Sequence, residues 1–179
     1  IIHLLILKRT TFLNELNQFC NTTFKNLFSE EHDLRLQLSS RFLGLNPKEI
    51  YTALQNNISE DLRRSKSLLG PHLDDYMLLF DGFNSYDFCS LGQQKMSYLS
   101  LLFAYVELFR YKFTSFPIVL MDDVSGELDE HRWKRLIEYL NSRDFQIMIT
   151  TANEKFGDEL EKIGGINKIH ISAGSVIKQ

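Results

Sequence analysis

Cysteine, proline and glycine are scarce in this sequence. The 179 residues include 2 cysteines, 3 prolines and 9 glycines. The two thiols, Cys20 and Cys89, lie in apolar sequence without metal-ligand spacing. They are too few for a disulfide framework, which favours a reducing, cytoplasmic setting. The composition also excludes a collagen-like or low-complexity chain.

Long apolar runs and a strong net charge are missing as well. The longest apolar run near the start, Leu4–Leu7, is followed by Lys8 and Arg9. It falls far short of the roughly 20 residues that a membrane-spanning helix needs. The formal net charge is −3 and the pI is about 6.0. These values disfavour a basic domain that coats nucleic acid, although a local basic patch is compatible with them.

What is present is the composition of a globular protein. Hydrophobic residues make up 44% of the chain, charged residues 24% and aromatic residues 12%. Such values are typical of one compact domain, alone or with an appendage. A chain of this length buries roughly 70% of the surface that it exposes when unfolded. It therefore needs no disulfide or metal to stabilise its core.

The first third of the chain has a mainly helical pattern. Apolar residues recur every three or four positions over residues 1–28, which predicts a helix with one buried stripe. Alternation over Leu34–Leu38 predicts a half-buried strand. Pro47, with Asn46 as its cap, begins a short helix that we expect to end near residues 56–57.

The rest of the chain alternates strands and helices. The expected elements are a hairpin strand at 77–80 closed by Asp81-Gly82, a helix from 93 to about 111 buried around most of its circumference, a strand at 118–121, a helix capped by Asp129, a strand at 145–149 and a closing hairpin at 168–177. Strand, helix and strand from 118 to 149 indicate a right-handed βαβ unit and a parallel sheet. The expected fold class is α/β, divided into a helical segment over residues 1–66 and a lobe over residues 67–179.

Two adjacent carboxylates follow the apolar strand at 118–121. Asp122 and Asp123 would lie at the carboxyl end of a buried strand, where α/β proteins bind ligands. Two buried, ionised carboxylates need a nearby cation. A Mg²⁺ ion that carries nucleotide phosphates would supply it. The alternative is a solvent-facing strand end whose aspartates cap a turn.

A polar segment precedes the long helix. Ser90 can cap this helix, and Gly92 permits close approach to the backbone. Free amides at a helix start attract phosphate, and Gln93 and Lys95 add hydrogen-bond donors. By itself the segment also fits an ordinary capped helix start.

Four blocks occur in an order that resembles the ABC-type ATPases and, in detail, the RecF-type DNA replication and repair proteins. Residues 69–75 resemble that family's Gly-Pro-His-Arg-Asp-Asp block, and residues 90–95 resemble its Ser-x-Gly-Gln-Gln-Arg signature. Residues 117–129 resemble its Walker B strand and the following loop, and residues 146–151 resemble its last core strand. The resemblance implies the distal half of an ABC-type ATPase head with an arm at its amino end.

The resemblance also implies roles for individual residues. Asp122 would hold Mg²⁺, and Asp123 would orient or deprotonate the water that attacks ATP. The signature residues would contact ATP across a head-to-head dimer, namely Ser90, Gly92, Gln93, Gln94 and Lys95. Asp129 would lie at the seam of that dimer. Thr151, next to Thr150, would occupy the place of a γ-phosphate-sensing histidine.

The sequence departs from the family at several positions. Leu73 stands at the family's Arg and Gly126 at a Ser, while Lys95 stands at an Arg and loses its bidentate fork. No glycine precedes a lysine, so the chain contains no G-x-x-x-x-G-K-[ST] phosphate loop. The family carries that loop ahead of the arm, and this chain begins with Ile1 rather than Met. We therefore expect the carboxyl-terminal half of a longer protein, without ATPase activity of its own.

The resemblance implies a function for that longer protein. In the family, ATP drives homodimerisation on DNA at gaps and junctions, where recombination mediator proteins help to load recombinase. The expected function is therefore that of an ATP- and Mg²⁺-dependent DNA clamp. It would act in recombinational repair and replication restart.

Two other hypotheses stay open at this point. The chain could serve only as a dimerisation or protein-interaction piece. It could also be a metal-dependent phosphohydrolase built on Asp74, Asp75, Asp122 and Asp123, which requires both pairs within about 4–6 Å of shared metals. The basic run at residues 63–66 either contacts DNA phosphate or forms a solvated face.

Overall fold

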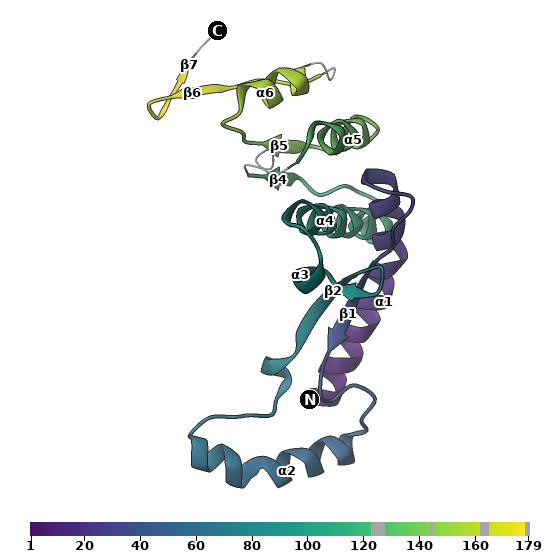
Figure 1. Cartoon of the computed structure of the whole chain (residues 1–179). Coiled ribbons are helices and arrows are strands. Elements are labelled where there is room, and N and C mark those ends of the chain that lie inside the picture. The colour runs from purple at the N-terminus through teal and green to yellow at the C-terminus, as the bar shows by residue number, and fades with distance from the viewer. Residues whose placement is uncertain (123–127, 144, 162–164, 178–179) are drawn as a thin grey trace. The chain divides into compact units, whose positions relative to one another are not determined.

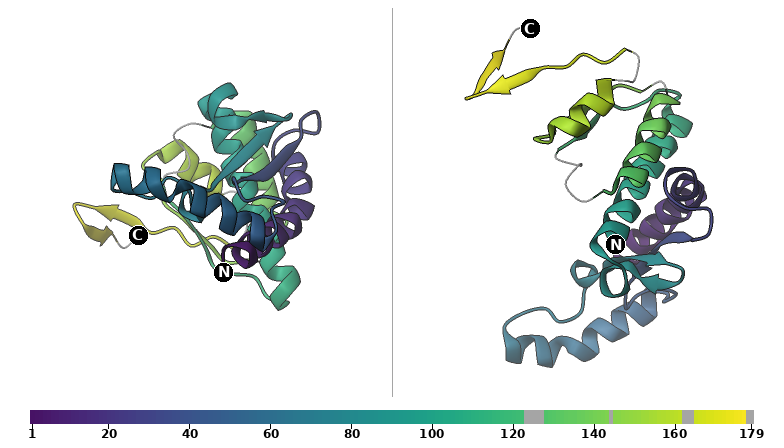
Figure 2. Two further views of the ribbon diagram at one scale, coloured as in Figure 1. Left: turned by 90° about the horizontal axis from the view of Figure 1, so that it is seen from below. Right: turned by 45° about the horizontal axis from the view of Figure 1, so that its top comes forward.

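The computed structural model describes residues 1–122, 128–143, 145–161 and 165–177. It divides into two compact units, Ile1–Ser115 (unit 1) and Phe116–Gln179 (unit 2). Figure 1 labels most of the helices and strands of both units, and Figure 2 gives two further views of them. Among the described residues, no helix is long and apolar enough to cross a membrane.

Unit 1 contains most of the helical residues. Its elements are α1 (Ile2–Leu27), β1 (Leu34–Ser39), α2 (Pro47–Arg64), the short 3-10 helix η1 (Pro71–Leu73), β2 (Asp75–Phe80), β3 (Phe83–Asn84), α3 (Ser85–Phe88) and α4 (Leu91–Phe113). The predicted first helix, first strand and long helix are confirmed, as is Asn46 as the cap of α2.

The sheet of unit 1 is antiparallel, with strand order β1-β2-β3. Leu34 of β1 pairs with Phe80 of β2, and Ser39 at the other end of β1 pairs with Asp75. Alternate residues of β1 are buried, as the sequence pattern predicts. The predicted hairpin is confirmed, because Asp81 and Gly82 both have positive φ, 49° and 84°, as a type I′ turn requires.

Two asparagines of α1 cover the free edge of β1. The Asn17 amide donates to the Leu36 carbonyl at 2.8 Å and accepts from the Leu36 N–H at 2.9 Å. Asn21 accepts from the Leu34 N–H at 3.0 Å. These side chains supply the hydrogen bonds that a further strand would have supplied, and they protect an edge that could otherwise pair with another chain.

The core of unit 1 lies between α1, α4 and the β1–β2 hairpin. Helices α1 and α4 pack side by side, which Figure 2 also shows. Phe24 of α1 and Phe103 of α4 are fully buried, and the Phe24 ring meets the edge of the Phe80 ring at 5.7 Å. Cys20 is buried in the same core, and burial raises the pKa of its thiol to about 11. The thiol is therefore protonated and unreactive at neutral pH.

Helix α2 extends further than the sequence pattern predicts. It ends at Arg64, with Ser65 in a left-handed conformation as its C-cap, rather than near residues 56–57. The polar stretch stays helical because its side chains bond along the helix. Asn57 donates to Asp61 at 2.5 Å, and Arg64 donates to Glu60 at 2.5 Å.

Helix α4 is also less buried than expected. Met96, Phe103 and Val106 are buried, but Tyr98 and Tyr105 are exposed on another face. The prediction of burial around most of the circumference is therefore wrong on that face. Tyr98 and Tyr105 line an apolar cavity of about 570 Å³ that α1, the sheet, α3 and α4 enclose in part. A tyrosine suits this place because its ring covers apolar surface while its hydroxyl reaches water.

Unit 2 contains the predicted strand-helix-strand arrangement. Its described elements are β4 (Val119–Met121), α5 (Glu130–Asn141), β5 (Ile147–Ile149), α6 (Glu154–Glu161), β6 (His170–Ser172) and β7 (Ser175–Ile177). Strands β4 and β5 pair in parallel, with Val119 opposite Ile147 and Met121 opposite Ile149. The closing hairpin of β6 and β7 is confirmed as well.

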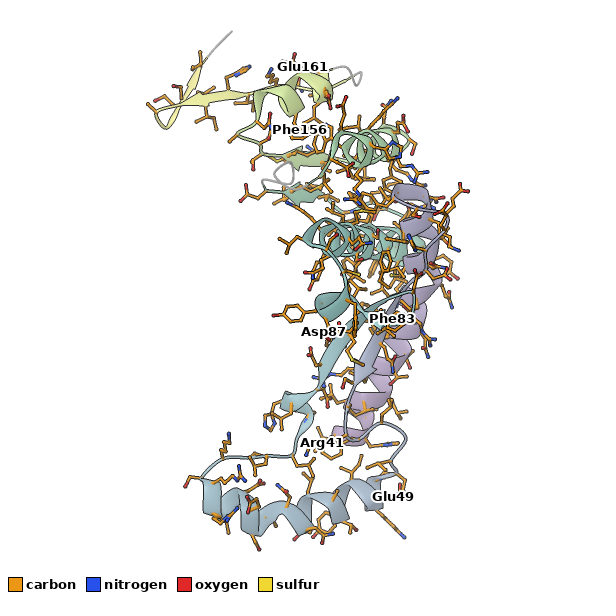
Figure 3. All side chains as sticks on the ribbon, in the orientation of Figure 1. Arg41, Glu49, Phe83, Asp87, Phe156 and Glu161 are labelled. Carbon is orange, nitrogen blue, oxygen red and sulfur yellow. The ribbon has the colours of Figure 1, made fainter. Side chains whose placement is uncertain are left out.

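The packing of unit 2 centres on α5. Trp133 and Leu136 are fully buried, and the Trp133 ring contacts the Phe156 ring of α6 at 4.7 Å between centroids. Figure 3 labels Phe156 at this contact. In β4, Val119 is 4% exposed while its neighbour Leu120 is 71% exposed. The expectation of a fully buried strand is therefore met on one face of β4 only.

The expected boundary between residues 66 and 67 stays a prediction. The β1–β2 pairing joins residues from both sides of that point into one sheet. The division into two compact units falls between Ser115 and Phe116, after α4 and before β4.

Candidate functional site

Ser90 caps the amino end of α4 through a reciprocal pair of hydrogen bonds. The Gln93 N–H donates to Ser90 Oγ at 3.3 Å, and the Ser90 N–H donates to Gln93 Oε1 at 2.9 Å. This capping box satisfies two amides at the helix start. Ser90 is nevertheless exposed, as is Leu91 beside it. The segment can therefore present its hydroxyl and the start of the helix to an anion from solvent.

Gln94 ties α4 to the short helix before it. Its amide Nε2 donates to the Tyr86 carbonyl at 3.2 Å and to the Cys89 carbonyl at 3.1 Å. Gly92 and Lys95 are half-buried in the first turn of α4. The predicted signature residues thus lie together in one turn. Gln94 acts there through the backbone of Tyr86 and Cys89 rather than through a free side chain.

A second polar group lies at the carboxyl ends of β4 and β5. Thr150, which follows β5, donates its hydroxyl hydrogen to Asp122, which follows β4. The Thr150 N–H also donates to the Met121 carbonyl at 3.0 Å and continues the strand pairing. Both side chains are exposed. Asp123, the expected water-orienting residue, and Gly126 lie outside the described residues.

The predicted residues that flank this group have local roles in unit 2. Asp129 caps α5, because its Oδ1 accepts from the Arg132 N–H at 2.9 Å. Its Oδ2 also lies 3.2 Å from an Arg132 guanidinium nitrogen. Thr151 Oγ1 accepts from the Asn153 N–H at 3.1 Å. It is therefore Thr150, rather than Thr151, that bonds to the Asp122 carboxylate.

The Gly-Pro-His block is held by a residue that the sequence pattern did not single out. Arg9 of α1 forms an ion pair with Asp74, whose side chain is almost fully buried, and donates to the Pro71 carbonyl at 3.0 Å. At Gly70, beside it, a Cβ would lie 2.5 Å from the ring of the exposed His72, which would then have to move. A lone arginine on a helix gives no signal in the sequence, since its partner is 65 positions away.

The ion pair with Arg9 argues against the hypothesis of a metal-dependent phosphohydrolase, which requires Asp74 as a metal ligand. Asp74 is bonded to Arg9, and breaking a buried ion pair is costly. Among the described residues, no group of three or more His, Cys, Asp and Glu side chains could hold a metal ion. Asp122, with one carboxylate beside one hydroxyl, offers the hard oxygen donors that Mg²⁺ prefers when water and phosphate complete its shell.

The basic run at the end of α2 is partly neutralised. Arg63 and Arg64 donate to Glu60 at 2.6 and 2.5 Å. These two hydrogen bonds lower the pKa of the Glu60 carboxyl below its usual range. The run therefore carries less free positive charge than its sequence indicates, which favours the solvated face over a DNA contact.

Comparison with known proteins gives the family. A family model described as the RecF/RecN/SMC N terminal domain matches residues 30–173. The chain belongs to this family. Among its RecF relatives, the DNA replication and repair protein RecF of Geotalea daltonii is 31% identical over 179 residues, which cover 97% of this chain and 49% of the relative. The chain thus spans about half the length of the curated relatives it matches.

Solved structures of the RecF/RecN/SMC family share the fold. The recombination mediator protein RecF-ATP in the RecFOR pathway superimposes with a TM-score of 0.73 at 22% identity, over 97% of this chain and 47% of that one. A structure from work on ATP-driven dimerization and DNA stimulated activation of SMC ATPases has a TM-score of 0.61 at 14% identity, over 96% of this chain and 86% of that one. The mixed helix and strand fold of RecF and SMC ATPase heads is thereby shown for this chain.

Proposed function

We propose that this chain is the signature- and Walker B-bearing part of a RecF-type DNA clamp. The clamp would bind ATP and Mg²⁺, dimerise with a second copy, and act with recombination mediator proteins at DNA gaps and junctions in the cytoplasm. The RecF relatives and the ATP-bearing RecF structure support the ATP and DNA-repair parts of this proposal.

The exposed, capped start of α4 carries the proposal. An exposed serine hydroxyl, followed closely by a glycine at the start of a long helix, suits one phosphate group. The site has no phosphate loop of its own, since no glycine in the chain precedes a lysine. It therefore suits a γ-phosphate that another subunit holds, and ATP would act as the bridge between two half-sites. Hydrolysis would then remove the bridge.

The residues that follow β4 and β5 in unit 2 would bind Mg²⁺ and activate the attacking water. When bound, Mg²⁺ would neutralise charge on the transferring phosphate. Asp122 would hold it through its carboxylate, and Thr150 would fix the orientation of that carboxylate through the hydrogen bond described above. Asp123 would orient or deprotonate the attacking water. Asp129 would lie at the dimer seam, and Thr151 would lie near the γ-phosphate.

Ser90→Arg in the full-length product of the gene tests the proposal. A large cationic side chain at Ser90 would occupy the place of the γ-phosphate. We expect monomers to bind ATP as before and ATP-driven dimerisation to be lost, as measured by analytical ultracentrifugation with and without ATP. Ser59→Arg, at an exposed serine of α2, is the matched control and should dimerise normally. Normal dimerisation of Ser90→Arg would reduce Ser90 to a helix cap.

Asp123→Asn separates binding from hydrolysis. We expect this variant to bind ATP and dimerise but not to turn ATP over, so that the dimer persists. Asp122→Asn should instead weaken binding of the Mg²⁺-ATP complex itself. Full hydrolysis by Asp123→Asn would show that another residue orients the water.

The 179-residue chain by itself gives a third readout. Without a phosphate loop it should show no ATP turnover above background. Turnover that disappears in Asp123→Asn would contradict this expectation. If the full-length product neither binds ATP nor dimerises with it, the chain is better described as a protein-interaction piece.

A further inference from the structure

The cavity of about 570 Å³ in unit 1 has the size and the walls of a small-molecule site. Its walls come from α1, α3, α4 and the sheet, and α3 lies beside β2 and α4 (Figure 1). Phe12, Tyr76, Tyr98 and Tyr105 contribute aromatic rings, and the Phe12 and Tyr105 centroids are 6.4 Å apart. Ligand cavities in proteins commonly have volumes of about 300–1,000 Å³ and apolar, aromatic walls.

One residue of the cavity wall has an unsatisfied hydroxyl. Ser85, the first residue of α3, is 3% exposed, and its Oγ has no hydrogen-bond partner in the described part of the chain. The residues around it are paired, since Asn84 accepts from the Tyr86 N–H at 3.2 Å and donates to Asp87 at 2.7 Å. A buried hydroxyl without a partner is costly to the folded state. A ligand with a hydrogen-bonding group would supply the missing partner.

The charge of the cavity wall indicates which ligands fit. None of the described residues that line the cavity is Asp, Glu, Lys, Arg or His. A charged ligand would lose its hydration there and gain no ionic partner, which disfavours phosphates, carboxylates and amines. A flat aromatic ring would instead pack against the tyrosine and phenylalanine rings. The wall therefore suits a neutral aromatic molecule and disfavours a nucleotide.

We propose that this cavity binds a small, neutral aromatic molecule with one hydrogen-bonding group. The aromatic part of the ligand packs against Phe12 and Tyr105, and its polar group bonds to Ser85 Oγ. Gln94 also lines the cavity, so the site borders the signature turn without including Ser90. The inference goes beyond the proposed function and is independent of it, because no part of it requires ATP or a second copy of the chain.

Fluorescence titration of the full-length gene product with two related probes tests the proposal. N-phenyl-1-naphthylamine is neutral, carries one N–H that can donate to Ser85 Oγ, and becomes brighter in apolar surroundings. We expect it to bind saturably, with one molecule per protein chain. 8-Anilinonaphthalene-1-sulfonate has the same rings and an added sulfonate. It should bind at least about tenfold more weakly, because the wall offers its charge no partner.

Substitutions in the cavity wall locate the probe. Leu102→Trp adds bulk at a residue that lines the cavity and should weaken binding of the neutral probe at least about tenfold. Leu62→Trp, at an exposed leucine of α2, is the matched control and should bind normally. Ser85→Ala should weaken binding by about two- to tenfold, through loss of one hydrogen bond. Without ligand, its melting temperature should not fall, since its hydroxyl has no partner to lose. Ser59→Ala is its exposed control.

Several outcomes would overturn this inference. If the full-length product does not bind the neutral probe, another part of the protein fills the cavity. Equal binding by Leu102→Trp and Leu62→Trp would place the probe elsewhere, and equal affinity for the two probes would show an unselective apolar surface. Unchanged binding by Ser85→Ala, or a lower melting temperature without ligand, would remove the role of its hydroxyl. Failure of ATP-driven dimerisation would contradict the proposed function and leave this inference standing.

Discussion

In unit 1 the first strand, β1, buries one apolar face and turns polar residues outward. In unit 2 the parallel strands β4 and β5 have one apolar face that is buried in β4 and half-buried in β5, and they expose apolar residues on the other face. The exposed residues of β1 are Arg35, Gln37 and Ser39. In β4 and β5 the exposed pair is Leu120 and Met148, which lie opposite each other in the register. The outward face of β1 is therefore polar, whereas β4 and β5 expose apolar side chains that can contact another surface.

The difference follows from the two sequence patterns. Leu34–Leu38 alternates apolar and polar residues, which specifies one buried face. Ile118–Met121 is apolar throughout, a pattern typical of a strand that is covered on both sides. The chain spans about half the length of the curated relatives it matches. Within the part of the chain that the structure describes, the side of β4 that carries Leu120 is exposed. A continuous apolar run thus predicts that both faces of a strand should be buried, even where the chain itself covers one face and leaves the other exposed.

The largest expected effect is on the core of unit 1. Phe24→Ala should cost about 3–5 kcal/mol of unfolding free energy, because a fully buried ring leaves a cavity between α1 and β2. Urea unfolding should be followed by far-ultraviolet circular dichroism, which α1 and α4 dominate, and by fluorescence of Trp133, the one tryptophan of the chain and a residue of unit 2. We expect the dichroism midpoint to fall more than the fluorescence midpoint. Equal shifts would show that the two units unfold as one, and Phe113→Ala is the exposed control.

The next largest effect concerns the protected edge of β1. Asn17→Ala removes both hydrogen bonds to Leu36 and should cost about 2 kcal/mol, at roughly 0.5–1.5 kcal/mol for each bond. Asn14→Ala, an exposed asparagine three residues earlier on α1, should change stability by less than about 0.5 kcal/mol. Chemical denaturation of both variants measures the difference. Equal stabilities would mean that water replaces the Asn17 amide at the edge.

Adjacent residues of β4 sharpen the contrast within unit 2. Val119→Thr places a hydroxyl on the buried face and should cost about 1–2 kcal/mol. Leu120→Thr changes the exposed face and should cost under about 0.5 kcal/mol while reducing self-association at high concentration. Trp133 fluorescence in urea and light scattering measure the two properties. Similar costs at both positions would show that the Leu120 face is covered in solution.

The smallest effect concerns the helix cap of unit 2. Asp129→Ala removes the bond to the Arg132 N–H and should cost about 1 kcal/mol. Asp129→Asn keeps an acceptor for that N–H and should recover most of the loss. Thermal unfolding of the two variants distinguishes the cap from the Arg132 ion pair, because the asparagine restores only the cap. Recovery of less than half would assign the stability to the ion pair.

Much of the local structure could be predicted because short-range rules govern it. The caps at Asn46, Ser90 and Asp129 and the Asp81-Gly82 turn all depend on residues within four positions of each other. The apolar pattern does not predict the end of α2 at Arg64, because side-chain pairs such as Asn57 with Asp61 extend the helix beyond its apolar stripe. Within the candidate site, the motif alone predicts the residues of the signature turn, whereas the hydrogen bond from Thr150 to Asp122 depends on the register of β4 and β5.

The sequence by itself determined the family and the order of helices and strands. These features arise from periodicity, capping and short motifs, whose physics is local. The tertiary structure decided which side chains meet across long separations. Asn17 covers the edge of β1, Arg9 holds Asp74, and Gln94 fixes the segment that precedes α4. Such contacts form when packing brings distant segments of the chain together, and no local pattern encodes them.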